Sequence, residues 1–406
     1  MSMHPEIAQE KISVEGGLGP FKEEIPLELH IKPLTVFIGP QGTGKSLLSQ
    51  LLYFFRDAQY LLSNHFSQES PDATVRKVVE GIRAGELTNR ALASFLTTPK
   101  VRVHYSSERG DQKEIAFYRS NRQINPLSPF KNDVAAWLQQ VIDDPSVSGR
   151  LFAKALFVPA ERTFYSRFIN VRPALLGESA LPITMREFSK TLSRAADTHQ
   201  MWQRERGIPP EVQQINDIVA AELGGRATIA TRGRFARQWQ WLPENSQQPL
   251  EIEMASSGQM GTWPLVSTIQ ALLGWPASQR PQYIHIEEPE THLHPAAQVA
   301  IVKMLAFLVN RGFKLVITTH SLELLYAINN LILAYQRLGE SELQNGFPSS
   351  QVRLNPENVI AYLFTDGTAY PVMTESSQID EGVLGRVLGN LEIEFNHLMA
   401  HGILWE

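Results

Sequence analysis

Short apolar runs alternate with amphipathic stretches along the chain, and this alternation predicts buried strands separated by helices. Residues 34–38 form a partly β-branched apolar run. Residues 47–55, which follow a glycine-rich turn, have the apolar density of a buried helix. Further buried strands are predicted by the run that ends at Pro159, by "YIHIE" and by "KLVITTH". The order of these elements is typical of an α/β fold.

Shorter alternating segments predict pairs of strands. "VRVHYSS" and "KEIAFYR" are expected to form a hairpin around residues 108–112, and "RATIATRGRFARQWQWL" a strand pair that turns at Gly233. "VIAYLFTDGTAYPV" predicts a third pair, followed by an amphipathic helix, and residues 296–310 predict a further helix. No heptad pattern is long enough for an extended coiled coil.

These patterns divide the chain into a core that is interrupted by a polar, mostly helical insertion. We expect the insertion to bind a partner, and we expect the last helix to pack on the core. The expected bounds are 1–55 and 220–375, with 150–165, for the core; 56–150 and 165–223 for the insertion; and 376–406 for the C-terminal helix.

Composition narrows the chemistry. The 406 residues include no cysteine, which excludes disulfides, thiolate zinc sites and a cysteine nucleophile. The net charge is −5, so only a local basic patch would attract nucleic acid. The polar N-terminus lacks a signal-peptide core, and no run reaches about 18 apolar residues, so we expect a cytoplasmic protein without a membrane span.

"GPQGTGKS" satisfies the pattern G-x-x-x-x-G-K-[ST] of a phosphate-binding loop and lies between a predicted strand and a predicted helix. Gly39, Gly42 and Gly44 let backbone N–H groups approach phosphate oxygens at the start of that helix. Lys45 is expected to reach the β- and γ-phosphates of ATP, and the Ser46 hydroxyl to bind Mg²⁺. An incidental glycine-rich turn is the alternative, and the strand–helix context favours the phosphate site.

Two adjacent carboxylates, Glu287 and Glu288, end the predicted strand "YIHIE". Successive strand residues point to opposite faces, so the two need not share one role. Beside a phosphate-binding loop, one can hold Mg²⁺ while its neighbour addresses the attacking water. The alternative is a solvated strand end. His292 and His294 follow, but no third ligand at metal spacing accompanies them, so we expect a loop role for both.

Two further motifs are weak when each is taken alone. "ASSGQ", residues 255–259, precedes a helix, and such turns cap many helices. His320 ends the strand "LVITTH", where a lone histidine is usually structural. Together with the loop and the acid pair they form an ordered set, because Gly258, Glu287 and His320 lie about 30 residues apart.

This order and spacing resemble an ABC-type P-loop ATPase head with an N-terminal β-lobe, a mostly helical insertion and no long coiled coil. Within that class the chain resembles the SMC, RecF and OLD-like group, because 210 positions separate Ser46 from Ser256. "FVPAER" and "IEEPETHLHP" are similar to OLD-family ATPases and to ATPase subunits of anti-phage systems of the PARIS and Septu types. The resemblance covers roughly residues 11–60, 150–165 and 220–375.

The resemblance implies a role for each motif residue. Lys45 and Ser46 would bind phosphate and Mg²⁺, with Glu287 at a metal position that is normally aspartate. Glu288 would be the general base and His320 the γ-phosphate sensor. The signature and loop positions that would contact ATP are Ser256, Ser257, Gly258 and Gln259, which act on the site of a second subunit, and Gln41, which replaces a commoner asparagine.

The implied function is a switch or sensor ATPase of an anti-phage system. It would form a homo-oligomer through ATP-sandwiched heads and control a separate effector, expected to be a nuclease, in response to a phage-encoded trigger. OLD nucleases continue into a nuclease domain, whereas 86 residues follow His320 here and contain no clustered D-x-D. The alternatives are a RecF-like DNA repair ATPase and an ATP-dependent scaffold with little turnover.

Two features stay open at this stage. A basic and aromatic segment is either a nucleic-acid strip or a solvated strand face packed on its neighbour, and the acidic net charge favours the strand face. Arg162 matches a recurring arginine of the OLD-like relatives, and a structural ion pair is at least as good an explanation of it. No glutamine can be assigned to a Q-loop. The segment consists of Arg226, Arg232, Arg234, Phe235, Arg237, Trp239 and Trp241.

Overall fold

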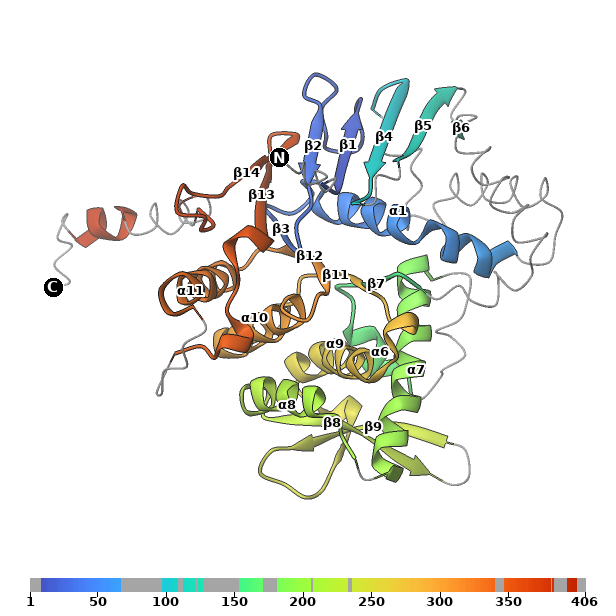
Figure 1. Cartoon of the computed structure of the whole chain (residues 1–406), viewed down its shortest axis with the longest axis vertical. Coiled ribbons are helices and arrows are strands. Elements are labelled where there is room, and N and C mark those ends of the chain that lie inside the picture. The colour runs from blue at the N-terminus through green and yellow to red at the C-terminus, as the bar shows by residue number, and fades with distance from the viewer. Residues whose placement is uncertain are drawn as a thin grey trace, which may run out of the picture.

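The computed structural model of the chain has a central sheet flanked by helices, with a smaller sheet above and another below (Figure 1). This mixed α/β architecture confirms the predicted fold class. The structure describes residues 9–66, 97–108, 112–120, 123–126, 153–170, 181–205, 207–232, 236–339, 347–380, 382 and 393–399.

Six strands form the central sheet in the order β14-β13-β3-β12-β11-β7. Five of them run parallel, and β14 pairs antiparallel with β13 at one edge. Because the carboxyl ends of parallel strands meet at one edge of a sheet, motifs far apart in the sequence come together there. The strands are β3 (Leu34–Ile38), β7 (Ala155–Val158), β11 (Tyr283–Glu287), β12 (Lys314–Thr319), β13 (Val359–Thr365) and β14 (Thr368–Pro371).

Each face of this sheet is covered by helices. On one face, Phe37, Phe157 and Val316 pack against α1 (Lys45–Phe66). The other face belongs to a larger core that contains most of the helices. These are α6 (Thr163–Phe168), α7 (Ile183–Glu205), α8 (Pro210–Leu223), α9 (Ser257–Gly274), α10 (Pro295–Val309) and α11 (Leu322–Leu338). The alternation of side chains across the buried strands therefore separates two cores.

The strands of the N-terminal lobe form an antiparallel sheet in the order β2-β1-β4-β5-β6. The predicted hairpin is present, with Ser106 opposite Gln112. It pairs with β1, however, and so belongs to the lobe and not to the helical insertion in which we expected it. The strands are β1 (Lys11–Glu15), β2 (Leu27–His30), β4 (Lys100–Ser106), β5 (Gln112–Ser120) and β6 (Gln123–Pro126).

The segment expected to complete the insertion is helical, as predicted, but it is packed into the larger core. Phe188 and Leu192 of α7 and Ile215 of α8 are fully buried there. Next to α8 lies the second predicted strand pair, while its turn at Gly233 lies outside the described residues. Its strands are β8 (Gly225–Arg232), β9 (Ala236–Pro243) and β10 (Leu250–Glu251), and short 3-10 turns span Ile252–Met254, Ala277–Gln279, Ser350–Val352 and Pro356–Asn358.

The C-terminal segment differs from expectation. Residues 393–399 are helical, but every side chain in them is exposed, and the helix lies away from the core at the left of Figure 1. The contact with the core that its amphipathic pattern predicts is therefore not made in this structure. Within the ranges described, the helices are all too short or too polar to cross a membrane.

Candidate active site

The glycine-rich loop joins β3 to α1 through backbone conformations that favour glycine. Gly39, Gly42 and Gly44 have φ angles of 139°, 77° and 100°. A Cβ atom at Gly39 would lie 2.4 Å from the Phe364 carbonyl oxygen, and one at Gly44 would lie 2.5 Å from the Phe21 ring. The loop therefore depends on glycine for its backbone and for its close contacts.

Lys45 is folded over this loop. Its ammonium donates hydrogen bonds of 2.7 Å to the carbonyl oxygens of Gly39 and Pro40, and the residue is 5% exposed. Burial lowers the pKa of Lys45, while the charges of Glu288 and Glu290 act in the opposite direction. The cation therefore lies within the field of the carboxylates that follow β11.

Glu287 is the buried member of the acid pair. It is 7% exposed, and its Oε1 lies 3.5 Å from Nε2 of Gln50 on α1. The side-chain oxygen of Gln50 is buried without a hydrogen-bond partner among the described residues. With the Ser46 hydroxyl, these groups offer the oxygen ligands that Mg²⁺ prefers, so the residues fit the expected ion. Gln50 carries no motif signal in the sequence.

Glu288 turns away from its neighbour. Its φ of 44° is left-handed, a conformation that is uncommon for a residue other than glycine and costly to hold. The backbone N–H donates to the Thr318 carbonyl at 2.9 Å, and Oε1 lies 3.1 Å from His320 Nε2. Glu288 and His320 side chains are 37% and 31% exposed. The structure thus brings these two predicted residues together in partial contact with solvent.

Glu290 is a site residue that the sequence reasoning missed. One of its oxygens accepts hydrogen bonds from the Thr319 hydroxyl at 2.6 Å and from the His320 N–H at 2.8 Å. The other oxygen is buried and has no hydrogen-bond partner within the described ranges. Glu290 therefore fixes the backbone of His320. The third carboxylate of "EEPE" was the signal available for it.

Arg162 is neither exposed nor paired with a carboxylate. It is 1% exposed and donates to four backbone carbonyls, which belong to two segments besides its own. It reaches Glu287 at 2.6 Å, Glu288 at 2.8 Å, and Gly261 and Pro159 at 2.9 Å each. Burial lowers the pKa of Arg162 to about 10 against the opposing charges of nearby glutamates. Arg162 thus ties the acid pair to α9 through backbone carbonyls, and the structural ion pair, which was the alternative, is not formed with a described residue.

The signature segment begins α9. Ser256 is its N-cap, and Ser256 and Gln259 exchange hydrogen bonds in a capping box. Gln259 also donates to the Leu223 carbonyl at 2.9 Å. A Cβ atom at Gly258 would lie 2.7 Å from the His292 carbonyl oxygen, so the segment packs on the loop that follows the acid pair. Its described hydrogen bonds do not reach the glycine-rich loop of the same chain.

The remaining candidates have structural positions. Trp239 and Trp241 are 3% and 2% exposed, so they pack in the core and present no stacking surface to a nucleic acid. The side chains of the other strip residues, apart from the exposed Arg226, lie outside the described residues. His294 caps α10 through its Nδ1. The described part of the chain holds no cluster of three histidine, aspartate or glutamate ligands, and the loop role of His292 stays a prediction.

Solved structures of SMC heads are similar to this chain in outline. One, bound to the C-terminal winged-helix domain of ScpA, has a TM-score of 0.47 and 12% identity, with 89% of this chain and 96% of that chain covered. Another, from Pyrococcus furiosus with an extended coiled coil and bound to the C-terminal domain of ScpA, has a TM-score of 0.46 and 11% identity, with coverages of 95% and 99%. The head domain from Thermotoga maritima scores 0.39 at 11% identity, with coverages of 90% and 99%.

No curated protein matches the chain. A family model does match, over residues 103–325, and it is described as the AAA ATPase domain. The matched stretch contains the signature segment, the acid pair and His320, and it covers more than half of the chain. The chain therefore belongs to the family of AAA ATPase domains.

Proposed function

We propose that the chain binds ATP with Mg²⁺ at the carboxyl edge of the central sheet and hydrolyses it there. The observation that carries the proposal is the convergence of three motifs on neighbouring parallel strands. The glycine-rich loop follows β3, His320 follows β12 and the acid pair ends β11, and β12 pairs with both of the others. Phosphoryl transfer uses such a combination of a phosphate cradle, a metal ligand and a group that positions the attacking water.

Phosphate binding falls to the loop and to Lys45. Backbone N–H groups at the start of α1 face the phosphates, and the helix dipole favours their charge. The Lys45 ammonium exchanges its two carbonyl partners for phosphate oxygens. Ser46, Glu287 and Gln50 would hold the Mg²⁺, and the bound ion would neutralise charge that develops on the phosphates.

Water activation falls to Glu288. Its carboxylate is partly exposed and accepts a proton from the attacking water, whereas Glu287 is buried beside α1. His320 contacts Glu288 at 3.1 Å and so orients the carboxylate. We assign the sensing of the γ-phosphate to the same histidine. The left-handed backbone of Glu288 is held for this purpose by Thr318 and Arg162.

Completion of the site requires a second copy in this proposal. Ser257 is exposed at the start of α9, and the signature segment contacts the loop after the acid pair instead of the phosphate loop of its own chain. Two heads that face each other therefore place each signature against the partner's ATP. Ser257→Arg is expected to abolish turnover without weakening ATP binding to the isolated subunit. Reduced ATP binding in a monomeric preparation would contradict assembly in trans.

We assign this ATPase to a switch that acts on a separate effector, expected to be a nuclease of an anti-phage system. The similarity of "FVPAER" and "IEEPETHLHP" to that group supports the assignment. A site shared by two subunits changes their contact with nucleotide state, and by linkage the partner changes ATP affinity in return. A RecF-like repair ATPase is the alternative, for which DNA binding would be intrinsic.

The test is co-purification of this chain with the product of its neighbouring gene, with and without ATP. We expect an association that depends on the nucleotide. The experiment uses Glu288→Gln protein to hold the ATP state and Lys45→Ala protein as the control that cannot reach it. DNA binding by the chain alone would favour the repair ATPase, and nuclease activity of the purified chain alone would overturn the switch.

A further inference from the structure

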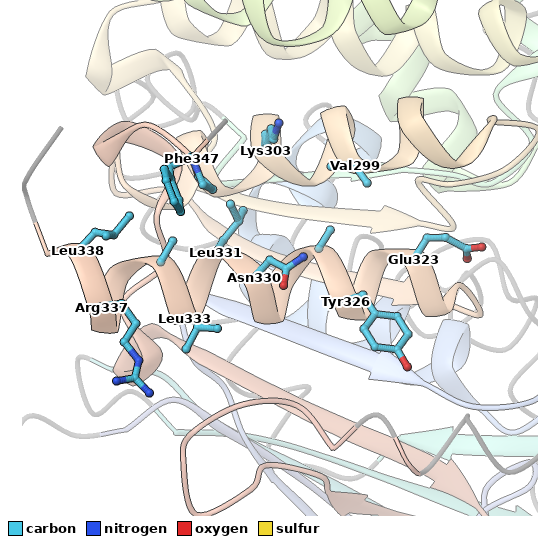
Figure 2. Close-up of a pocket in the computed structure, with 13 residues that line it drawn as sticks. Val299, Lys303, Glu323, Tyr326, Asn330, Leu331, Leu333, Arg337, Leu338 and Phe347 are labelled. Atoms are coloured by element: carbon cyan, nitrogen blue, oxygen red, sulfur yellow. The ribbon is translucent and has the colours of Figure 1, made fainter. Parts of the chain in front are cut away.

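An apolar groove runs between α10 and α11 (Figure 2). Its cavity volume is about 620 Å³. Val299 of α10 and Leu333 of α11 line it together with Phe347, and the small side chain of Ala327 leaves room between them. Leu333 and Phe347 are 39% and 58% exposed. Exposed apolar surface of this extent is typical of a protein-binding site.

The C-terminal helix, residues 393–399, offers an apolar face to match. Phe395, Leu398 and Met399 are 61%, 62% and 69% exposed. At 100° per residue these three side chains lie on one side of the helix. An amphipathic helix with such a face binds into an apolar groove of another surface. The molecule therefore exposes both a groove and a helix of the kind that fills one.

Charge favours the same pairing. Lys303 and Arg337 line the groove, with Glu323 at the end where α11 begins. Glu394 of the C-terminal helix is exposed and lies beside the apolar face. Pairing of Glu394 with Lys303 or Arg337 would set the orientation of the helix in the groove. The groove thus offers more basic than acidic side chains to the segment that carries Glu394.

The chain leaves the core at the side of α11. The Asn329 side-chain amide donates to the Ile379 carbonyl and accepts from the Ile379 N–H, at 2.8 Å each, and Gln336 donates to the Ser376 carbonyl. Twelve residues separate Asp380 from Ile393, and a stretch of that length spans at most about 40 Å. That is long enough to reach a groove on an adjacent molecule.

We propose that the groove between α10 and α11 binds the C-terminal helix of a second copy of this chain, and that the exchange is reciprocal. Within one copy the groove is open and the helix lies away from it, although the connection has the length to bring them together. Two copies that exchange helices cover both grooves and both helices through one twofold-symmetric contact. The contact needs no nucleotide and rests on no part of the proposed function.

The absence of cysteine makes disulfide trapping a direct test. Leu333→Cys protein and Leu398→Cys protein are mixed under mild oxidation. Only a helix from one copy in the groove of the other gives a covalent dimer that contains both variants. Tyr370→Cys, at a residue that is 47% exposed outside the groove, replaces Leu333→Cys as the control and should give little product. A disulfide confined to single chains of the double variant would overturn the proposal, as would equal trapping of the control.

Sedimentation of the nucleotide-free protein gives a second measurement. Leu398→Asp and Leu333→Asp should each weaken dimerisation at least about 10-fold, as expected for an apolar anchor in an interface. Tyr370→Asp should not, and melting curves confirm that each variant folds. Lys45→Ala protein should dimerise as the wild type does. If dimers form only with ATP, or if the wild type is monomeric at its highest soluble concentration, the helix exchange fails while the proposed function stands.

Discussion

The phosphate-binding loop and the acid end of β11 lie at one edge of the same sheet, but they are held in different ways. Lys45 donates both of its side-chain hydrogen bonds within its own loop, to the carbonyl oxygens of Gly39 and Pro40. Glu288, by contrast, is held by Thr318, His320 and Arg162, which come from other elements. In the proposed function, nucleotide binding is therefore built from a local segment, and water activation is built from tertiary packing. Damage at a distance should reduce turnover before it reduces binding.

Glu288→Gln should give the largest difference between the effect on turnover and the effect on ATP binding. The amide keeps the shape of the side chain but cannot accept the proton of the attacking water. Turnover should fall at least about 100-fold, the usual range for loss of a general base. ATP affinity, measured by calorimetry, should be unchanged, and the ATP-bound assembly should accumulate. If Glu287→Gln alone stops turnover and Mg²⁺ binding survives it, the roles of the two carboxylates are reversed.

Lys45→Ala tests the contribution of the glycine-rich loop to ATP binding. Loss of one charge-assisted interaction with phosphate should weaken ATP binding by about 10- to 100-fold. The fold should remain intact, because the two carbonyls that Lys45 contacts lie in a loop where solvent can replace it. Calorimetry on protein with a normal melting curve measures this. Unchanged Mg-ATP affinity would argue against the phosphate-loop assignment.

A smaller effect is expected from Arg162→Met, which removes the contacts between the acid pair and α9. Displacement of Glu288 should lower kcat about 10-fold per folded molecule while KM stays near its wild-type value. Arg162→Lys should not restore the rate, because an ammonium cannot reproduce the planar set of N–H donors of the guanidinium group. Arg167→Met, at an exposed residue of α6, is the matched control. A change in stability alone, with normal kcat, would make Arg162 purely structural.

The smallest effect concerns Asp57, which joins α1 to the start of β7. It lies at a kink in α1, is 2% exposed and accepts a hydrogen bond of 2.9 Å from the Lys154 N–H at the start of β7. Burial raises the pKa of Asp57 to about 7. The folded state therefore holds this proton more tightly than the unfolded state does, and stability should fall as pH rises from about 4 to 7.

Asp57→Asn keeps the acceptor but has no proton to lose. The melting temperature of Asp57→Asn minus that of the wild type should increase by a few degrees as the pH rises across the same interval. Differential scanning calorimetry at several pH values measures the difference. A constant difference across this range would show that Asp57 titrates at an ordinary pKa.

The sequence predicted the parts of the site that neighbouring residues define. The glycine-rich loop, the acid pair and His320 each combine a motif with a strand end, and the parallel sheet brings them together. The roles of Gln50 and Arg162 could not be predicted from the sequence, because they depend on packing between elements that are far apart in the chain. Glu290 was visible as a third carboxylate, but its bond to the His320 N–H depends on the register of β11 and β12.

Prediction of the fold was limited in the same way, to features that neighbouring residues define. Strands and helices with clear periodicity were predicted, whereas their assignment to a domain was not. The hairpin of β4 and β5 joined the N-terminal lobe because the edge of β1 was available to β4, a pairing across about 90 residues that no local pattern records. The C-terminal helix has the pattern of a packed helix, but amphipathicity says only that a partner exists. It does not say which surface provides one.

The position of β3 has a consequence for how the protein is made. This fully buried strand lies between β12 and β13, and Gly39 touches Phe364 across that contact. At about 5–20 residues per second, the ribosome needs roughly 15–60 s to proceed from β3 to β12. During that time an apolar strand has both edges unpaired, which is a hazard for aggregation. The nucleotide pocket of the nascent chain therefore stays unformed until almost the whole polypeptide has emerged, and a chaperone that covers β3 would set the yield of active ATPase.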